Sequence, residues 1–150
     1  MIILRIIIII LLAISLIVIT HLFPNFNKKD DHQIVLEDFK ELSISVADTV
    51  DSRIKGLSGR DALPEGEVML FIFDTPDKHG IWMKDMKFSI DIVWIDQNDQ
   101  IVSIEENVAP DTYPKVFYPT EKSTLVLEAN AGFVKRNNLK VGNFLNFNQK

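Results

Sequence analysis

Apolar and polar positions alternate along much of the chain beyond residue 41, which is the pattern of half-buried β-strands. In the first such stretch Leu42, Ile44 and Val46 alternate with small or polar residues. Residues 68–74, VMLFIFD, are apolar at consecutive positions instead, as is typical of a central strand covered on both faces. Strands are predicted over residues 42–47, 68–74, 80–86, 89–96, 100–108, 124–130 and 141–147.

Two short helices are predicted between these strands. Thr49 or Asp51 is suited to cap the start of the first helix, and Gly56 is suited to end it. The second helix is predicted in AGFVKRN, residues 131–137. Six or seven short strands with two short helices indicate a compact, β-rich and barrel-like α+β domain.

The first 23 residues follow a different pattern, with an almost unbroken apolar run over residues 6–23. At about 1.5 Å per residue, a helix of this length spans roughly 27 Å, close to the hydrocarbon thickness of a bilayer. Arg5 lies near the start of the run and can reach the membrane interface. We therefore expect residues 1–23 to form an N-terminal transmembrane signal anchor, with the membrane contacted through residues 6–23.

A cleaved signal peptide and a buried soluble helix are the alternatives to an anchor. The apolar run is longer than the roughly 7–15 residues of a signal-peptide core, and no small-x-small cleavage site follows it. Residues 24–41 are polar and are interpreted as a linker to the folded domain. The very short N-terminal tail favours a single-pass protein of the cell membrane whose C-terminal domain lies outside the cytoplasm, although Lys28 and Lys29 oppose this orientation.

Composition narrows the possible functions. The chain has 150 residues, enough for one domain, and its net charge of −5 with no basic stripe argues against binding of nucleic acid. It contains no cysteine, so disulfides and thiolate metal sites are excluded. His79 is the only histidine of the folded domain, and we expect no metal and no cofactor.

Charged residues inside the predicted strands are the candidate functional groups. Alternation places Asp91 on one face of its strand with Val93 and Ile95, and places Glu128 on one face of its own strand among apolar neighbours. Buried carboxylates need partners, because their desolvation otherwise costs several kcal/mol. We therefore expect Asp91 and Glu128 to come together with Lys84, with Arg53 and Arg60 as further counter-charges. The two acids then either line a cleft or merely brace the fold.

Six ordered motifs resemble the DUF192 (UPF0127) family. They are ADT at residues 47–49, RIKGLSGR at 53–60, MLFIF at 69–73, WMKDMKFSIDIVWID at 82–96, VLEANAG at 126–132 and VGN at 141–143. The resemblance implies a compact β-rich α+β domain over residues 42–147 and no established activity. It also implies recurrent polar positions, which fall on Arg53, Arg60, Lys84, Asp91 and Glu128. One departure is Asn143, which stands where the family pattern has an aspartate.

These observations favour a binding module for a small polar or saccharide ligand. The predicted ligand-binding residues are Trp82, Lys84, Asp91, Tyr118, Glu128 and Arg60. One alternative is an envelope assembly or interaction protein whose partner the sequence does not identify. Another is a hydrolase that uses Asp91 and Glu128 as an acid–base pair, which requires their carboxyl groups roughly 5–10 Å apart across an open cleft.

Overall fold

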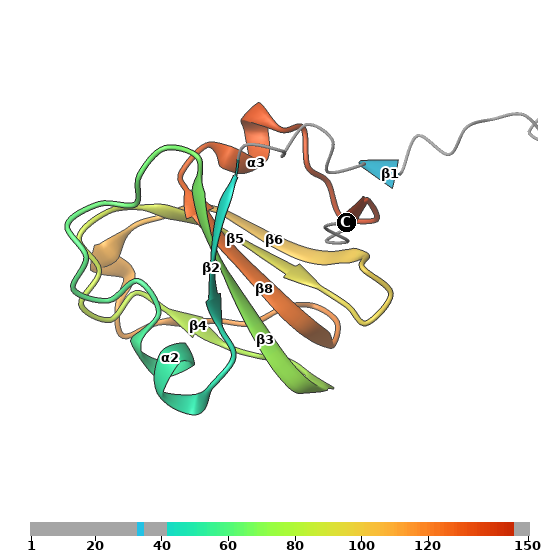
Figure 1. The fold of residues 1–150 in the computed structure, drawn as a ribbon, viewed down its shortest axis with the longest axis horizontal. Coiled ribbons are helices and arrows are strands. Elements are labelled where there is room, and N and C mark those ends of the chain that lie inside the picture. Colours follow the sequence, from blue (N-terminus) through green and yellow to red (C-terminus); the bar gives the residue numbers. More distant parts are fainter. Residues whose placement is uncertain (1–32, 35–41, 146–150) are drawn as a thin grey trace, which may run out of the picture. The chain divides into compact units, whose positions relative to one another are not determined.

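A five-stranded sheet forms the centre of the domain in the computed structural model, which describes residues 33–34 and 42–145 (Figure 1). The strand order is β2-β3-β8-β5-β6, with β2 parallel to β3 and the other neighbours antiparallel. The bounds of these strands are β2 Ser43–Ala47, β3 Glu67–Asp77, β5 Ile90–Ile95, β6 Ile101–Val108 and β8 Ser123–Asn130. Two small ladders join β4 (Ile81–Trp82) to β7 (Val116–Phe117) and β1 (Gln33–Ile34) to β9 (Phe144–Leu145).

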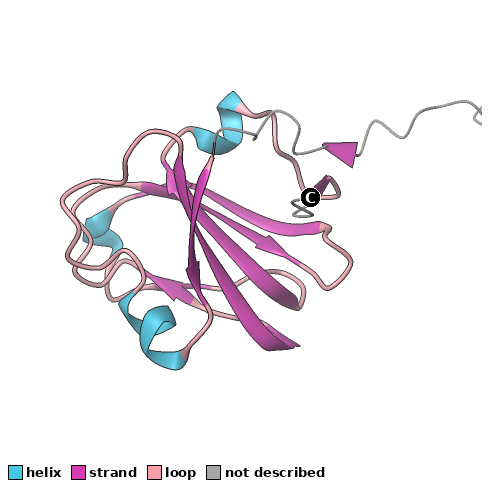
Figure 2. Ribbon diagram, viewed as in Figure 1, coloured by secondary structure: helices cyan, strands magenta, loops and turns pink. Residues whose placement is uncertain are grey.

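The helices are short, as predicted. They are α2 (Val50–Lys55), the 3-10 helix η2 (Pro110–Thr112) and α3 (Phe133–Arg136). Thr49 caps α2, because its hydroxyl accepts a hydrogen bond from the Ser52 backbone N–H while the Ser52 hydroxyl accepts from the Thr49 N–H. In Figure 2 strands form the centre of the described domain and the helices are short segments at its periphery.

The expected barrel-like form is wrong. The five-stranded sheet ends at β2 and β6, and within the described residues these two edge strands do not pair with each other, so the sheet stays open. The predicted strand at residues 80–86 is also shorter than expected, because only Ile81–Trp82 pair with another strand. Asp85 adopts a φ of +55°, and the Met86 N–H bonds to the Met83 carbonyl, so the chain turns directly after Trp82.

Both faces of the sheet are covered by apolar side chains. Ile92, Trp94 and Val126 belong to the core on the side of α2, whereas Val93 and Leu127 belong to the core on the side of α3. The period-two alternation predicted for β5 and β8 is therefore confirmed. Because the side chains of β5 and β8 alternate between the two cores, α2 and α3 are attached to opposite faces of the same sheet (Figure 1).

The predicted anchor at residues 6–23 and the predicted linker at residues 24–41, apart from β1, lie outside the described residues. In the part of the chain that the structure does describe, no helix is long and apolar enough to span a bilayer.

Asp91 joins β5 to two other segments from inside the protein. Its side chain has no exposed surface. One carboxyl oxygen accepts from the Asn107 backbone N–H at 2.8 Å, and the other accepts from the Val134 N–H at 2.9 Å. Asp91 therefore holds β6 and α3 against the centre of the sheet. Its contact on β6 is Asn107, a residue with positive φ.

We expect Asp91→Asn to lower the free energy of unfolding by about 2–3 kcal/mol, because the amide nitrogen would face a backbone donor and leave a buried N–H without an acceptor. Urea unfolding of the full chain measures this loss. Asp61→Asn is the control, since Asp61 pairs with Lys87 on the exposed surface and its loss should leave the unfolding midpoint almost unchanged. Equal stability of Asp91→Asn and the wild type would contradict the bracing role.

Candidate functional site

A pocket of about 190 Å³ opens on the face of the sheet that carries α2. We call it the Glu128 pocket. Its walls come from α2 and the turn that follows, from β3, from β4 and from β8 (Figure 1). The side chains that matter for its chemistry are Arg53, Lys55, Phe71, Phe73, Trp82 and Glu128. The pocket is smaller than the roughly 300–1,000 Å³ of sites for drug-sized ligands, so it has room for only a small chemical group.

Glu128 forms the floor of the pocket. Its relative exposure is 4%, and across the sheet it lies between Met69 of β3 and Ile92 of β5. Its carboxyl group makes no hydrogen bond or ion pair with any other described residue, although it lines the pocket. Burial in these apolar surroundings raises the pKa of Glu128 to about 8, so the carboxyl group is mostly neutral at pH 7.

Arg53 and Phe73 build one wall in a fixed arrangement. Arg53 Nη1 donates to the Asp48 and Ile72 carbonyl oxygens, both at 2.7 Å, which ties α2 to β3. The guanidinium lies over the Phe73 ring, 5.1 Å from its centroid, and the Phe73 ring is stacked on His79 at 3.6 Å. These contacts position a cation at the edge of the pocket without any carboxylate partner among the described residues.

Trp82 lies on the short strand β4 and is 44% exposed, so its ring is available at the mouth of the pocket. β4 is packed closely against the chain after β7. A Cβ atom at Gly80 would come within 2.6 Å of both Val116 Cγ1 and Tyr118 Cε1. Gly80 lines the pocket and is required for this close approach, whereas Tyr118 is not among the lining residues.

Asp91 and Glu128 lie on opposite faces of the sheet, so the expectation that they gather is wrong. On β8, Glu128 is paired with Ile92, and Asp91 is paired with Ala129. Neighbours in a strand point to opposite faces, which places Asp91 in the α3 core and Glu128 in the α2 core. Two carboxyl groups separated by the sheet cannot flank one substrate, which rules out this pair as the acid and base of a hydrolase.

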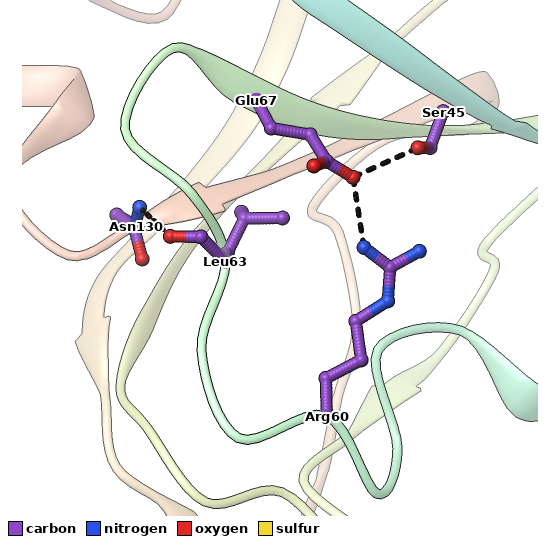
Figure 3. Close-up of polar contacts among 5 residues, drawn as sticks. All are labelled: Ser45, Arg60, Leu63, Glu67 and Asn130. Atoms are coloured by element: carbon purple, nitrogen blue, oxygen red, sulfur yellow. Dashed lines mark hydrogen bonds and ion pairs between the residues drawn. The ribbon is translucent and has the colours of Figure 1, made fainter.

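Lys84 and Arg60 also lie away from the predicted cluster. Lys84 is exposed, and its carbonyl accepts a hydrogen bond from Ser58 Oγ. Arg60 donates to Glu67 Oε1 at 2.8 Å, and the same oxygen accepts from Ser45 Oγ (Figure 3). The hydrogen bond from Arg60, and then the one from Ser45, lowers the pKa of Glu67. Arg60 thus links the turn after α2 to β3 and β2.

Of the six predicted ligand-binding residues, the structure brings Trp82 and Glu128 to the pocket, and whether any of the six binds a ligand stays a prediction. The sequence did not single out Phe71 and Phe73, because a strand apolar on both faces gives no sign of which side chains border an opening. Their common parity in MLFIF places them on one face, but the neighbouring strand cannot be identified from that pattern. In the part of the chain that is described, no group of three His, Asp or Glu side chains is arranged to hold a metal ion.

The open sheet with one short helix on each face and a pocket on the α2 side defines a small β-rich α+β domain. The chain belongs to the DUF192 family, described as uncharacterized ACR, COG1430, whose model matches residues 33–147. The match confirms the resemblance found in the motifs.

Two solved structures are similar to this chain, each with a TM-score of 0.64. A candidate transcription regulator from Sinorhizobium meliloti 1021 is 31% identical, and the match covers 67% of this chain and 78% of that one. A protein of unknown function from Novosphingobium aromaticivorans DSM 12444 is 27% identical, with coverage of 67% and 71%. A search among curated proteins finds no match.

The raised pKa of Glu128 predicts a loss of stability with rising pH. Below pH 4.5 the group is protonated in both the folded and the unfolded chain. Between pH 4.5 and about 8 only the unfolded chain ionises, which lowers the free energy of unfolding by about 3–5 kcal/mol across this window.

Urea unfolding of the wild type and of Glu128→Gln at several pH values from 4.5 to 9 isolates this contribution, because the glutamine does not titrate. The stability of the wild type should fall relative to the variant as the pH rises, with little further change above pH 8. A constant difference between the two proteins over the whole range would show that Glu128 titrates normally in the folded state.

Proposed function

We propose that this protein is a binding module that takes one small polar molecule into the Glu128 pocket, and that residues 1–23 hold it at the membrane. The observation that carries the proposal is a carboxyl group that is 4% exposed, lines a pocket and has no partner among the described residues. No completely buried side-chain polar atom of the described residues lacks a hydrogen-bond partner, so the Glu128 oxygens keep some exposed surface in the pocket, where a ligand can hydrogen-bond to them.

The other walls of the pocket suit a ligand with an apolar or flat part. Trp82 offers an exposed aromatic surface, and Phe71 and Phe73 line the same space. Sites of this kind combine mostly apolar walls with a few polar groups that set the orientation of the ligand. No nucleophile with an adjacent base lies among the lining residues of the Glu128 pocket, which favours binding over catalysis.

An interaction role is the second candidate, because two exposed apolar side chains are next to each other on α2. Val50 and Ile54 are four residues apart, so they lie on one face of the helix, and they are 64% and 61% exposed. Ile54 also lines the pocket. Val50 does not, so a Val50→Ser variant that loses a protein partner and keeps small-molecule binding would support this second role.

A thermal-shift screen of small polar molecules against the full chain tests the first role. A ligand present at 100 times its dissociation constant should stabilise the protein by about 2.7 kcal/mol. Trp82→Ala and Glu128→Gln should each weaken binding at least tenfold, because each removes a contact inside the pocket.

Two matched controls lie outside the pocket. Tyr113→Ala removes an aromatic ring that is 47% exposed, close to the 44% of Trp82, and Glu106→Gln makes the same acid-to-amide change at an exposed position. Both controls should bind as the wild type does. Ligands whose stabilisation survives in Trp82→Ala and Glu128→Gln would place the binding site elsewhere and contradict the proposal.

A further inference from the structure

The Glu128 pocket is lined by one acid and two cations that have no charged partner among the described residues. At the floor, both oxygens of Glu128 lack a partner among the described residues. From α2, Arg53 and Lys55 line the same pocket. The ion pairs within the described residues are Arg60–Glu67 and Lys87–Asp61, so neither cation of α2 has a carboxylate partner there.

We infer that the pocket takes a small zwitterion of the amino-acid type, with its ammonium group on Glu128 and its carboxylate group on Arg53 and Lys55. The inference rests on the proposed binding function and names the class of ligand. It depends on three features of the pocket lining, which are the buried acid Glu128, the two cations of α2 and the aromatic side chains.

An ammonium group is the best complement to the floor. It supplies three donors and a positive charge, so it satisfies both oxygens of an ionised Glu128, whereas a neutral hydroxyl donates only once. No cation of the described chain makes this contact with Glu128.

A carboxylate group is the best complement to the edge formed by α2. Arg53 is held in place because its Nη1 donates to two carbonyl oxygens, and its remaining N–H groups make no hydrogen bond within the described residues. A fixed guanidinium with free donors binds a carboxylate with little loss of side-chain entropy. A simple amine would leave these donors unused, and a simple carboxylic acid would leave Glu128 without a cation.

Binding should release a proton, because the ammonium group requires the ionised form of a Glu128 whose pKa is about 8 in the free protein. The groups that face Glu128 from neighbouring elements are uncharged on β3, β4 and β5, where they are Met69, Phe71, Trp82 and Ile92, among others. Arg53 and Lys55 on α2 are the only ionisable groups among the other residues that line the pocket.

Isothermal titration of the full chain with matched ligands tests the inference. The probes are alanine, 4-aminobutanoate and 5-aminopentanoate as zwitterions, pentanoate without an ammonium group, butylamine without a carboxylate group, and glucose as a neutral polyol. At least one zwitterion should bind tenfold more tightly than pentanoate, butylamine and glucose. Its binding at pH 7 should release close to one proton, measured in buffers of different ionisation enthalpy, and at pH 9 the release should be small.

Two variants assign the two ends of the ligand. Glu128→Gln should weaken the zwitterion at least tenfold and abolish the proton release. Arg53→Met should remove the advantage of the zwitterion over butylamine. Glu106→Gln is the control and should bind normally, and circular dichroism confirms that each variant is folded.

The results that would overturn the inference differ in which part of it they contradict. Zwitterion binding without proton release refutes the contact between the ammonium group and Glu128. Tighter binding of glucose or pentanoate refutes the ligand class but keeps the binding function. The same holds if no zwitterion binds while another small molecule binds in a Trp82-dependent manner. If no small molecule binds at all in the thermal-shift screen, the proposed function fails together with the inference.

Discussion

A buried carboxyl group must be hydrogen-bonded, ion-paired or neutral, and this protein contains two such groups on adjacent strands of one sheet. Asp91 and Glu128 have almost the same burial and nearly opposite surroundings. Asp91 accepts two backbone hydrogen bonds and ties β6 and α3 to β5. Glu128 has apolar neighbours, and its pKa is raised to about 8 by burial alone. Asp91 stabilises the fold, whereas Glu128 lines the pocket without a partner among the described residues, and we propose that it binds a ligand there.

The difference between the two acids follows from the faces of the sheet. The α3 face receives a helix whose backbone N–H at Val134 points at Asp91, so the chain itself supplies the partner. The α2 face receives a helix that follows its N-cap residue Thr49 and is only six residues long, and the turn after it leaves a pocket over Glu128. Arg53 borders this pocket and is held by hydrogen bonds to two carbonyl oxygens. It does not form an ion pair with Glu128.

Local patterns in the sequence were sufficient to predict most strands, both short helices and the face of each residue in β5 and β8. They were not sufficient to predict which strands are neighbours, and the candidate site depended on that information. The pairing of Ile92 with Glu128 places these two side chains on the same face of the sheet, so Asp91, the neighbour of Ile92, lies on the opposite face. Alternation within each strand cannot reveal this relation. The open edges at β2 and β6, and the turn at Asp85 that ends β4, likewise depend on tertiary contacts rather than on propensity. Membership of the DUF192 family was predictable because the motifs and their order are found in the sequence itself, without knowledge of which residues are in contact.

The proposed site depends on the protonation state of the Glu128 carboxyl group in the free protein, and carbon-13 NMR can observe that group directly. Labelling the glutamate side-chain carboxyl carbons, assigning Glu128 from the signal lost in Glu128→Gln, and following its shift with pH gives its pKa without reference to stability or binding. The expected value is about 8, with a further change in the titration when a ligand enters the pocket. A titration midpoint near 4.5, the value of an exposed glutamate, would show that the carboxyl group is solvated or paired, and the proposed site would lose its physical basis.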